Sequence, residues 1–111
     1  MEQEHMGNLL KKGAVRLATA LNEVAGERVA YYESAELDNP RTKWVLESYG
    51  NWKELYGFLI LLSDEYTHAF NEEHIVRGVM ERLSVTSMKY AGQFPAQATT
   101  EYIGLKEKQD D

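Results

Sequence analysis

The side chains of this chain that could take part in chemistry are concentrated in the segment SDEYTHAFNEEH, residues 63–74. Glu65 and His68 stand three residues apart, so they would meet on one face of a helix. That spacing is typical of half of a di-iron site, which needs two such motifs and two further carboxylates. Since the segment holds the motif once, the sequence predicts neither a metal site nor a cofactor. The other carboxylates, Asp64, Glu72 and Glu73, are expected at a solvated helix end and a capped helix start.

A second group of functional side chains recurs at helical spacing: Trp44, Glu47, Ser48 and Asn51. If one helix continues past Gly50, this stripe extends along the same face to Glu65. Glu65 would then lie at the edge of an apolar face, partly desolvated or paired. Polar groups on a core face must be satisfied, so they either bond to one another and to a neighbouring backbone or line a pocket. Ser48 has a competing role, because it could cap a new helix that begins at Tyr49.

The elements that must position these side chains are all helical. In a first segment of about residues 5–32, apolar residues recur at helical spacing from Leu9 to Ala25, and Gly26 is expected to end this helix. The stretch AGERVAYYESAEL, which includes Gly26, is expected to be a second short helix or a loop. Asn39 and Pro40 form a strong helix start, as N-cap and first helical residue. The segment 51–70 is apolar on most of its circumference, which predicts the central helix of the fold. Asn71 is expected to cap a further helix over 75–83.

The pattern fades after Ser84, and Pro95 blocks a helix through the last part of the chain. The prediction is therefore an all-α protein, a small bundle of about four helices with an irregular C-terminal tail. Residues 1–104 are expected to form one domain and residues 105–111 a frayed tail. Apolar side chains are expected to pin the tail to the bundle: Met88, Tyr90, Phe94, Tyr102 and Ile103.

Composition narrows the class of protein. The chain has 111 residues, no cysteine, a net charge of −6 and a pI near 5.1. Non-specific DNA binding needs a basic surface, so none is expected. The longest apolar run, LYGFLILL, is far short of the about 20 residues of a membrane span, and no membrane association is expected. The start lacks the pattern of a signal peptide, which predicts a cytoplasmic protein.

The order of these motifs resembles a largely uncharacterised family of small proteins from bacteriophages and some bacteria. The shared pattern is Pro, then Trp, Glu-Ser, Asn-aromatic, a Leu-rich helix, Glu-Tyr-Thr and His. The positions that match are Pro40, Trp44, Glu47, Ser48, Asn51, Trp52, Leu55, Glu65, Tyr66, Thr67 and His74, with His5 in the opening helix. The resemblance implies that His5 and His74 belong with the Trp44–Glu65 stripe. The tail FPAQATTEYIG also resembles a family segment.

The chain departs from the family pattern at four charged positions. Asn39 replaces a histidine, Glu4 a lysine, Lys12 an acidic residue and Ala69 an arginine. If these groups take part in chemistry in the family, that chemistry is lost or altered here. A link to phage DNA or nucleotide modification follows from this setting by analogy alone.

Two functional hypotheses remain open from the sequence. The first is a non-catalytic interaction module that modulates a host factor, steered by its acidic surface and anchored by tyrosines and tryptophans. The alternative is a small enzyme or binding protein with a pocket between helices for a nucleotide or modified base. Its pocket residues would be Trp44, Glu47, Ser48, Asn51, Glu65, Tyr66, His74 and His5. Glu47 and Glu65 would be acid–base or ligand-orienting groups, and His5 and His74 proton carriers or anion contacts. A homodimer formed through the most apolar helix is a further hypothesis.

Overall fold

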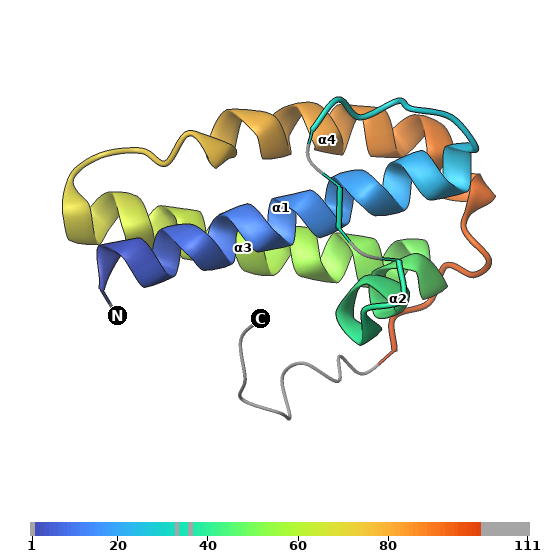
Figure 1. The fold of residues 1–111 in the computed structure, drawn as a ribbon, viewed down its shortest axis with the longest axis horizontal. Helices are drawn as coiled ribbons and strands as arrows, with labels where there is room; N and C mark the ends of the chain where they lie inside the picture. The colour runs from blue at the N-terminus through green and yellow to red at the C-terminus, as the bar shows by residue number, and fades with distance from the viewer. Residues whose placement is uncertain (1, 33, 36, 101–111) are drawn as a thin grey trace.

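The computed structural model describes residues 2–32, 34–35 and 37–100. Within them the chain forms α1 (Gln3–Ala25), α2 (Pro40–Glu47), α3 (Tyr49–Phe70), α4 (Val76–Tyr90) and a 3-10 turn, η1 (Ala91–Gln93). Figure 1 shows the three long helices side by side, with short α2 at one end. The prediction of a small all-α bundle is confirmed. No helix of the described ranges is long and apolar enough to cross a membrane.

The starts of α2 and α3 follow from local capping. The Asn39 side chain accepts a hydrogen bond of 2.8 Å from the backbone N–H of Arg41, and Pro40 is the first helical residue, as predicted. Ser48 has extended backbone angles, and its hydroxyl accepts a 2.9 Å hydrogen bond from the N–H of Asn51. The chain therefore turns at Ser48 and starts a new helix, so one helix does not pass from Trp44 to Glu65.

The first helix ends where the sequence predicts. Gly26 has φ 72°, and its N–H donates to the carbonyls of Asn22 and Glu23. This left-handed conformation is open to glycine at little cost and satisfies the last carbonyls of the helix. The segment that follows, expected to be a short helix or a loop, is a loop. It returns over α1 before α2 begins (Figure 1).

The central helix of the bundle is α1, which corrects the prediction that α3 would be. α1 packs against α2, α3 and α4, and its inner face is buried from Met6 to Leu21. On α3, by contrast, Phe58 and Leu61 are 49% and 67% exposed. The helix is apolar around much of its circumference, but its neighbours cover only one side of it. One core joins the four helices and includes both tryptophans, Trp44 and Trp52.

The start of α4 also differs from the prediction. Asn71 adopts φ 56° and ends α3, donating its N–H to the carbonyl of Thr67. Asparagine tolerates the left-handed conformation, which makes it as suitable for a helix end as for an N-cap. Helix α4 begins only at Val76, so Glu72 and Glu73 lie in the connection and not in its first turn.

Part of the tail is held as predicted. Phe94 is buried against the core and its ring lies 5.6 Å from that of Tyr49. Met88 is 67% exposed, so it does not pin the tail, because the buried face of α4 runs through Val76, Met80 and Leu83 instead. Tyr102, Ile103 and the expected frayed tail 105–111 lie outside the described residues.

Two helical glycines give a direct test of the α1–α3 packing. A Cβ on Gly13 of α1 would lie 2.5 Å from Leu59 Cδ1, whereas a Cβ on Gly57 of α3 would meet nothing within 4 Å. Both substitutions to alanine gain helix propensity of about 1 kcal/mol. Only Gly13→Ala adds overpacking, which costs about 1–3 kcal/mol. The Gly13→Ala chain should be less stable than the Gly57→Ala chain by that amount in urea unfolding. Equal stabilities would contradict the close contact.

Candidate functional site

The predicted polar residues meet at the turn between α2 and α3. We call Trp44, Glu47, Ser48 and Asn51 the elbow. Trp44, Ser48 and Asn51 are buried, whereas Glu47 is exposed at the rim. The segment 94–100, which we call the strap, crosses the elbow on its way from η1. The backbone and one threonine side chain of the strap supply most of the elbow's hydrogen-bond partners.

Asn51 is the centre of this contact. Its Oδ1 accepts a 2.7 Å hydrogen bond from the N–H of Thr100, and its Nδ2 donates to the Thr100 hydroxyl at 2.9 Å. Nδ2 also donates to the carbonyl of Trp44 at 2.7 Å, and Glu47 Oε1 lies 3.5 Å away. The Thr100 hydroxyl in turn donates to Glu47 Oε1 at 3.1 Å. The fully buried amide is thus satisfied on both its oxygen and its nitrogen.

Two backbone contacts complete the attachment of the strap. The indole Nε1 of Trp44 donates to the Thr100 carbonyl at 3.2 Å. The N–H of Tyr49, which has no partner inside its own helix, donates to the Ala96 carbonyl at 2.9 Å. Gly50 permits this approach, since a Cβ there would overlap the Gln97 carbonyl oxygen and lie 2.7 Å from the Thr99 nitrogen. Apart from the Thr100 hydroxyl, the strap is therefore held through its own main-chain groups.

The structure separates Glu65 from the elbow. Because the chain turns at Ser48, the two ends of the predicted stripe belong to different helices. Glu65 is exposed, contrary to the expectation of partial burial, because none of the helices in the described residues covers that side of α3. With Met6, Asp64, His68 and Ala69 it lines an open depression of about 410 Å³.

Tyr66 and His74, two of the candidate pocket residues, lie next to each other. Their rings pack edge to face with centroids 5.1 Å apart. The Tyr66 hydroxyl accepts a 3.0 Å hydrogen bond from Gln3 Nε2, which also lies 3.3 Å from Glu72 Oε1. His5 lies on the exposed side of α1, away from the core. Gln3, Tyr66 and His74 thus link the start of α1, the last part of α3 and the connection to α4, and nothing in the sequence singled out Gln3.

His74 acts as the cap that α4 otherwise lacks. Its Nδ1 accepts a 3.1 Å hydrogen bond from the N–H of Val76. An imidazole that accepts at Nδ1 is neutral and carries its proton on Nε2. Burial lowers the pKa of His74 below 6.5, and the nearby Glu72 carboxylate raises it to a smaller extent. His74 is thus held as a neutral structural group near pH 7.

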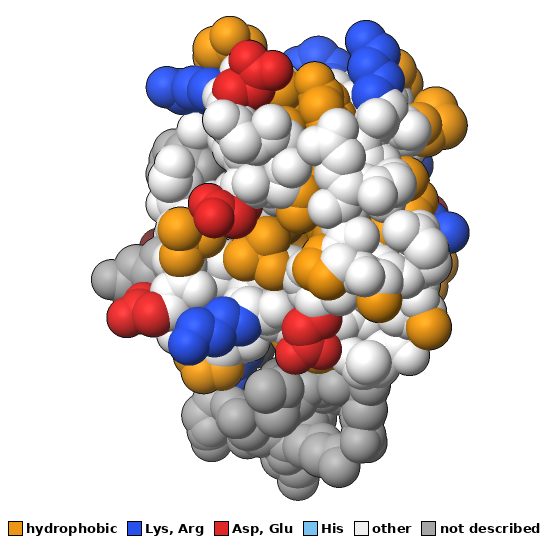
Figure 2. Space-filling view, turned by 90° about the vertical axis from the view of Figure 1, so that its right-hand side faces the viewer, with side chains coloured by type: hydrophobic (Ala, Val, Ile, Leu, Met, Phe, Trp, Pro, Cys, Tyr) orange, Lys and Arg blue, Asp and Glu red, His pale blue; other side chains and the backbone are white. Residues whose placement is uncertain are grey.

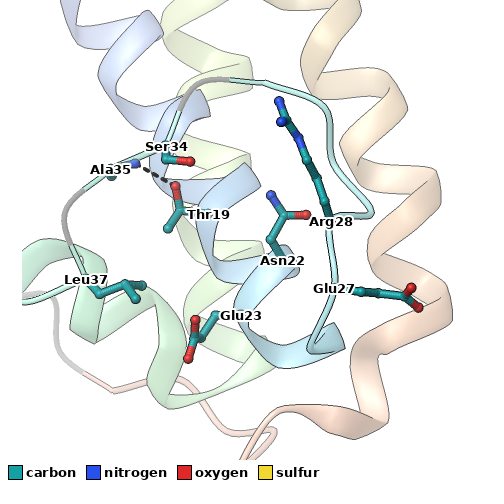
Figure 3. Close-up of a pocket in the computed structure, with 8 residues that line it drawn as sticks. All are labelled: Thr19, Asn22, Glu23, Glu27, Arg28, Ser34, Ala35 and Leu37. Atoms are coloured by element: carbon teal, nitrogen blue, oxygen red, sulfur yellow. Dashed lines mark hydrogen bonds between the residues drawn. The ribbon is translucent and has the colours of Figure 1, made fainter.

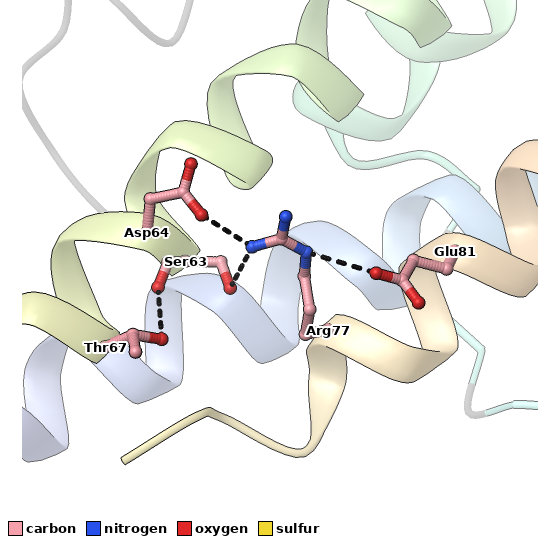
Figure 4. A network of polar contacts seen from close by, with 5 residues as sticks. All are labelled: Ser63, Asp64, Thr67, Arg77 and Glu81. Carbon is pink, nitrogen blue, oxygen red and sulfur yellow. Dashed lines mark hydrogen bonds and ion pairs between the residues drawn. The ribbon is translucent and has the colours of Figure 1, made fainter. Parts of the chain in front are cut away.

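Arg77 also ties α4 to α3. Its Nη1 donates to Asp64 Oδ1 at 2.7 Å and to the buried Ser63 hydroxyl at 3.3 Å (Figure 4). Its Nε lies 3.5 Å from Glu81 Oε2. The hydrogen bond to Asp64 raises the pKa of Arg77 further. Asp64, expected at a wet helix end, has a defined partner that the sequence did not reveal.

A cavity of about 320 Å³ lies under the loop between α1 and α2. Figure 3 shows Thr19 and Asn22 of α1 facing this loop. Asn22 Oδ1 accepts 2.7 Å hydrogen bonds from the N–H groups of Val29 and Ala30, and Thr19 Oγ1 accepts one from Ala35. Thr19 and Asn22 are therefore already used to hold the loop.

The described residues contain no group of three or more His, Asp or Glu side chains placed to share a metal ion. Comparisons of the chain with models of protein families, with curated proteins and with solved structures give no match. The resemblance to the phage family therefore stays a prediction.

Asn51 should be the most sensitive polar residue of the elbow. In Asn51→Ala the carbonyl of buried Trp44 loses its partner, which costs about 1–3 kcal/mol, whereas the N–H of exposed Thr100 can bond to water instead. Urea unfolding should show a loss of about 1–3 kcal/mol. The matched control is Asn8→Ala, an exposed asparagine on α1, for which a change within about 0.5 kcal/mol is expected. Similar losses in both variants would contradict the account.

His74 should make stability depend on pH in one direction. Because its pKa is lower in the folded chain than in the unfolded one, the unfolded chain binds more protons below pH 6.5. The stabilisation from neutral His74 is present above pH 6.5 and is lost as the pH falls through the folded pKa. The stability difference between the native chain and His74→Gln should therefore shrink from pH 7.5 to about pH 5. The exposed His68, changed to Gln, should leave the native pH profile intact.

Proposed function

We propose that this protein is a non-catalytic interaction module that binds a basic, amphipathic segment of a partner protein on the outer face of α3. We use this term for Glu54, Phe58, Leu61 and Glu65, which follow one another at helical spacing. The observation that carries the proposal is the exposure of Phe58 and Leu61, 49% and 67%, in the middle of a long, well-packed helix. Exposed apolar side chains clustered on a helix mark a contact site.

The anchors differ from those expected from the sequence. Trp44 and Trp52 are both buried in the core, so the tryptophans do not serve as anchors. Trp52 donates its Nε1 to the Leu17 carbonyl at 3.0 Å, and Trp44 donates its own to the strap. Phe58 and Leu61 lie one helical turn apart and take this role on the outer face of α3.

Charge specifies the chemistry of the partner. Exposed Glu54 and Glu65 lie on either side of the apolar pair, and the chain carries a net charge of −6. An acidic rim around an apolar centre attracts a basic segment and speeds its encounter. The end of the molecule drawn in Figure 2 has a different surface, where acidic, basic and hydrophobic side chains are intermixed.

The open depression beside the outer face of α3 suits a lysine or arginine side chain of such a segment. Met6 and Ala69 supply apolar contacts, and Asp64 and Glu65 supply carboxylates. A lysine or arginine side chain buries its methylene groups on apolar surface while its charged head stays at the polar edge. A basic residue next to the apolar anchors of the partner would therefore fill this depression. The resemblance suggests a host protein as the partner.

The alternative of a nucleotide or modified-base pocket has less support in the geometry. Of its proposed residues, Trp44, Ser48 and Asn51 are engaged with one another and with the strap, and Glu65 is exposed on another helix. No cavity described above is lined by both proposed acid–base residues, Glu47 and Glu65. We therefore favour the interaction module.

A synthetic amphipathic helix of leucine and lysine tests the proposal. Added to the ¹⁵N-labelled chain, it should shift amide signals of residues 54–68 of α3, and the binding should weaken as salt is added. The double substitution Phe58→Ser and Leu61→Ser removes both anchors and should weaken binding about tenfold or more.

The matched control is Val85→Ser with Met88→Ser, two exposed apolar residues of α4. This variant should bind as the native chain does. A leucine–glutamate helix of the same pattern should not bind, because like charges repel. Equal binding of both peptides, or equal loss in both double variants, would refute the outer face of α3 as the contact site.

A further inference from the structure

The elbow makes a set of contacts that is typical of the recognition of an extended peptide. One residue of the strap, Thr100, is held at its N–H, its carbonyl and its hydroxyl by Asn51, Trp44 and Glu47. The Ala96 carbonyl is held by the N–H of Tyr49. Main-chain contacts supply affinity for any extended segment, and the hydroxyl contacts select threonine at one position.

The side chains of the strap contribute little to this contact. Residues 95–100 are exposed, and Phe94 is the strap residue whose side chain is buried in the core. Beyond Phe94 the strap is therefore held by hydrogen bonds more than by apolar burial. Such bonds contribute only about 0.5–1.5 kcal/mol each after exchange with water. A segment attached in this way can leave and return without disturbing the core.

We propose that the elbow is a binding site for an extended, threonine-containing segment of a partner protein, occupied here in cis by the strap. The cis occupant identifies the ligand chemistry: an extended main chain that passes close to Gly50, as Gln97 and Thr99 do, followed by a threonine that reaches Asn51. Gly50 is essential to this fit, because a Cβ there would collide with the main chain of any segment that follows the same path. The site is separate from the outer face of α3 and does not depend on the function proposed for that face.

The covalent attachment of the strap explains how the site is controlled. A tethered segment acts at an effective concentration in the millimolar range, so a free peptide of equal intrinsic affinity competes poorly. The native chain should therefore bind such a peptide weakly. Weakening the strap, without altering the elbow, should raise the apparent affinity for a peptide supplied in trans.

The experiment uses the full chain with Thr100→Val, which keeps a β-branched side chain but removes the hydroxyl contacts to Asn51 and Glu47. The probe is the peptide FPAQATT, residues 94–100, acetylated and amidated. Two lost hydrogen bonds correspond to about tenfold, so the variant should bind the peptide about tenfold more tightly than the native chain does. The same peptide with valine as its last residue should bind the variant about tenfold more weakly.

The two indole signals give an internal control. Trp44 Nε1 donates to the strap, whereas Trp52 Nε1 donates to the Leu17 carbonyl inside the bundle. In Thr100→Val the Trp44 indole signal should move, and FPAQATT should return it towards its native position. The Trp52 signal should stay fixed throughout, which shows that the core is intact.

Three results would overturn the proposal. The first is equal peptide binding by the native chain and Thr100→Val, or none by either. The second is equal binding of the threonine and valine peptides. The third is a Thr100→Val chain that sediments as a dimer with a native Trp44 signal before peptide is added. In that case the strap of a second copy, and not a foreign segment, would be the occupant.

Discussion

The architecture around the α2–α3 turn depends on the hydrogen bonding of one buried amide. Asn51 is fully buried, so every bond its side chain gives up to water must be replaced inside the protein. The carbonyl of Trp44 in the preceding helix provides one partner for this side chain, and the N–H and hydroxyl of Thr100 provide two more. Ser48, at the end of that helix, accepts the backbone N–H of Asn51. The helix break at Ser48 and the contact between Asn51 and Thr100, 49 positions apart, thus both serve to satisfy the polar groups of Asn51.

This constraint explains both the success and the failure of the sequence analysis at the elbow. Helical spacing identified Trp44, Glu47, Ser48 and Asn51 as a group, and they do meet. The stripe could not extend to Glu65, because the same serine that belongs to it is a better N-cap than a helix interior residue. The capping role, weighed as an alternative, is the one that the structure has.

Elsewhere in the fold, too, local sequence signals predict some helix boundaries correctly and others wrongly. The starts at Asn39 and Ser48 and the end at Gly26 follow from caps and backbone conformations within a few residues. The prediction for Asn71 was wrong because asparagine suits a helix start and a helix end equally. The local sequence does not distinguish the end of the helix before Asn71 from the start of the helix after it. The partners of Asn51, Tyr66 and Asp64 lie on other elements, so Thr100, Gln3 and Arg77 had no local signature.

Two surfaces follow from these contacts, and they differ in kind. Among the described residues the outer face of α3 is exposed and offers apolar and acidic groups, whereas the elbow is covered by the chain's own strap. The closure of the elbow depends on the hydrogen bonds between Asn51 and Thr100. A double-mutant cycle with Asn51→Ala and Thr100→Val, followed by urea unfolding, measures it directly. We expect a coupling free energy of at least about 1 kcal/mol. Additive losses, with no coupling, would contradict the account.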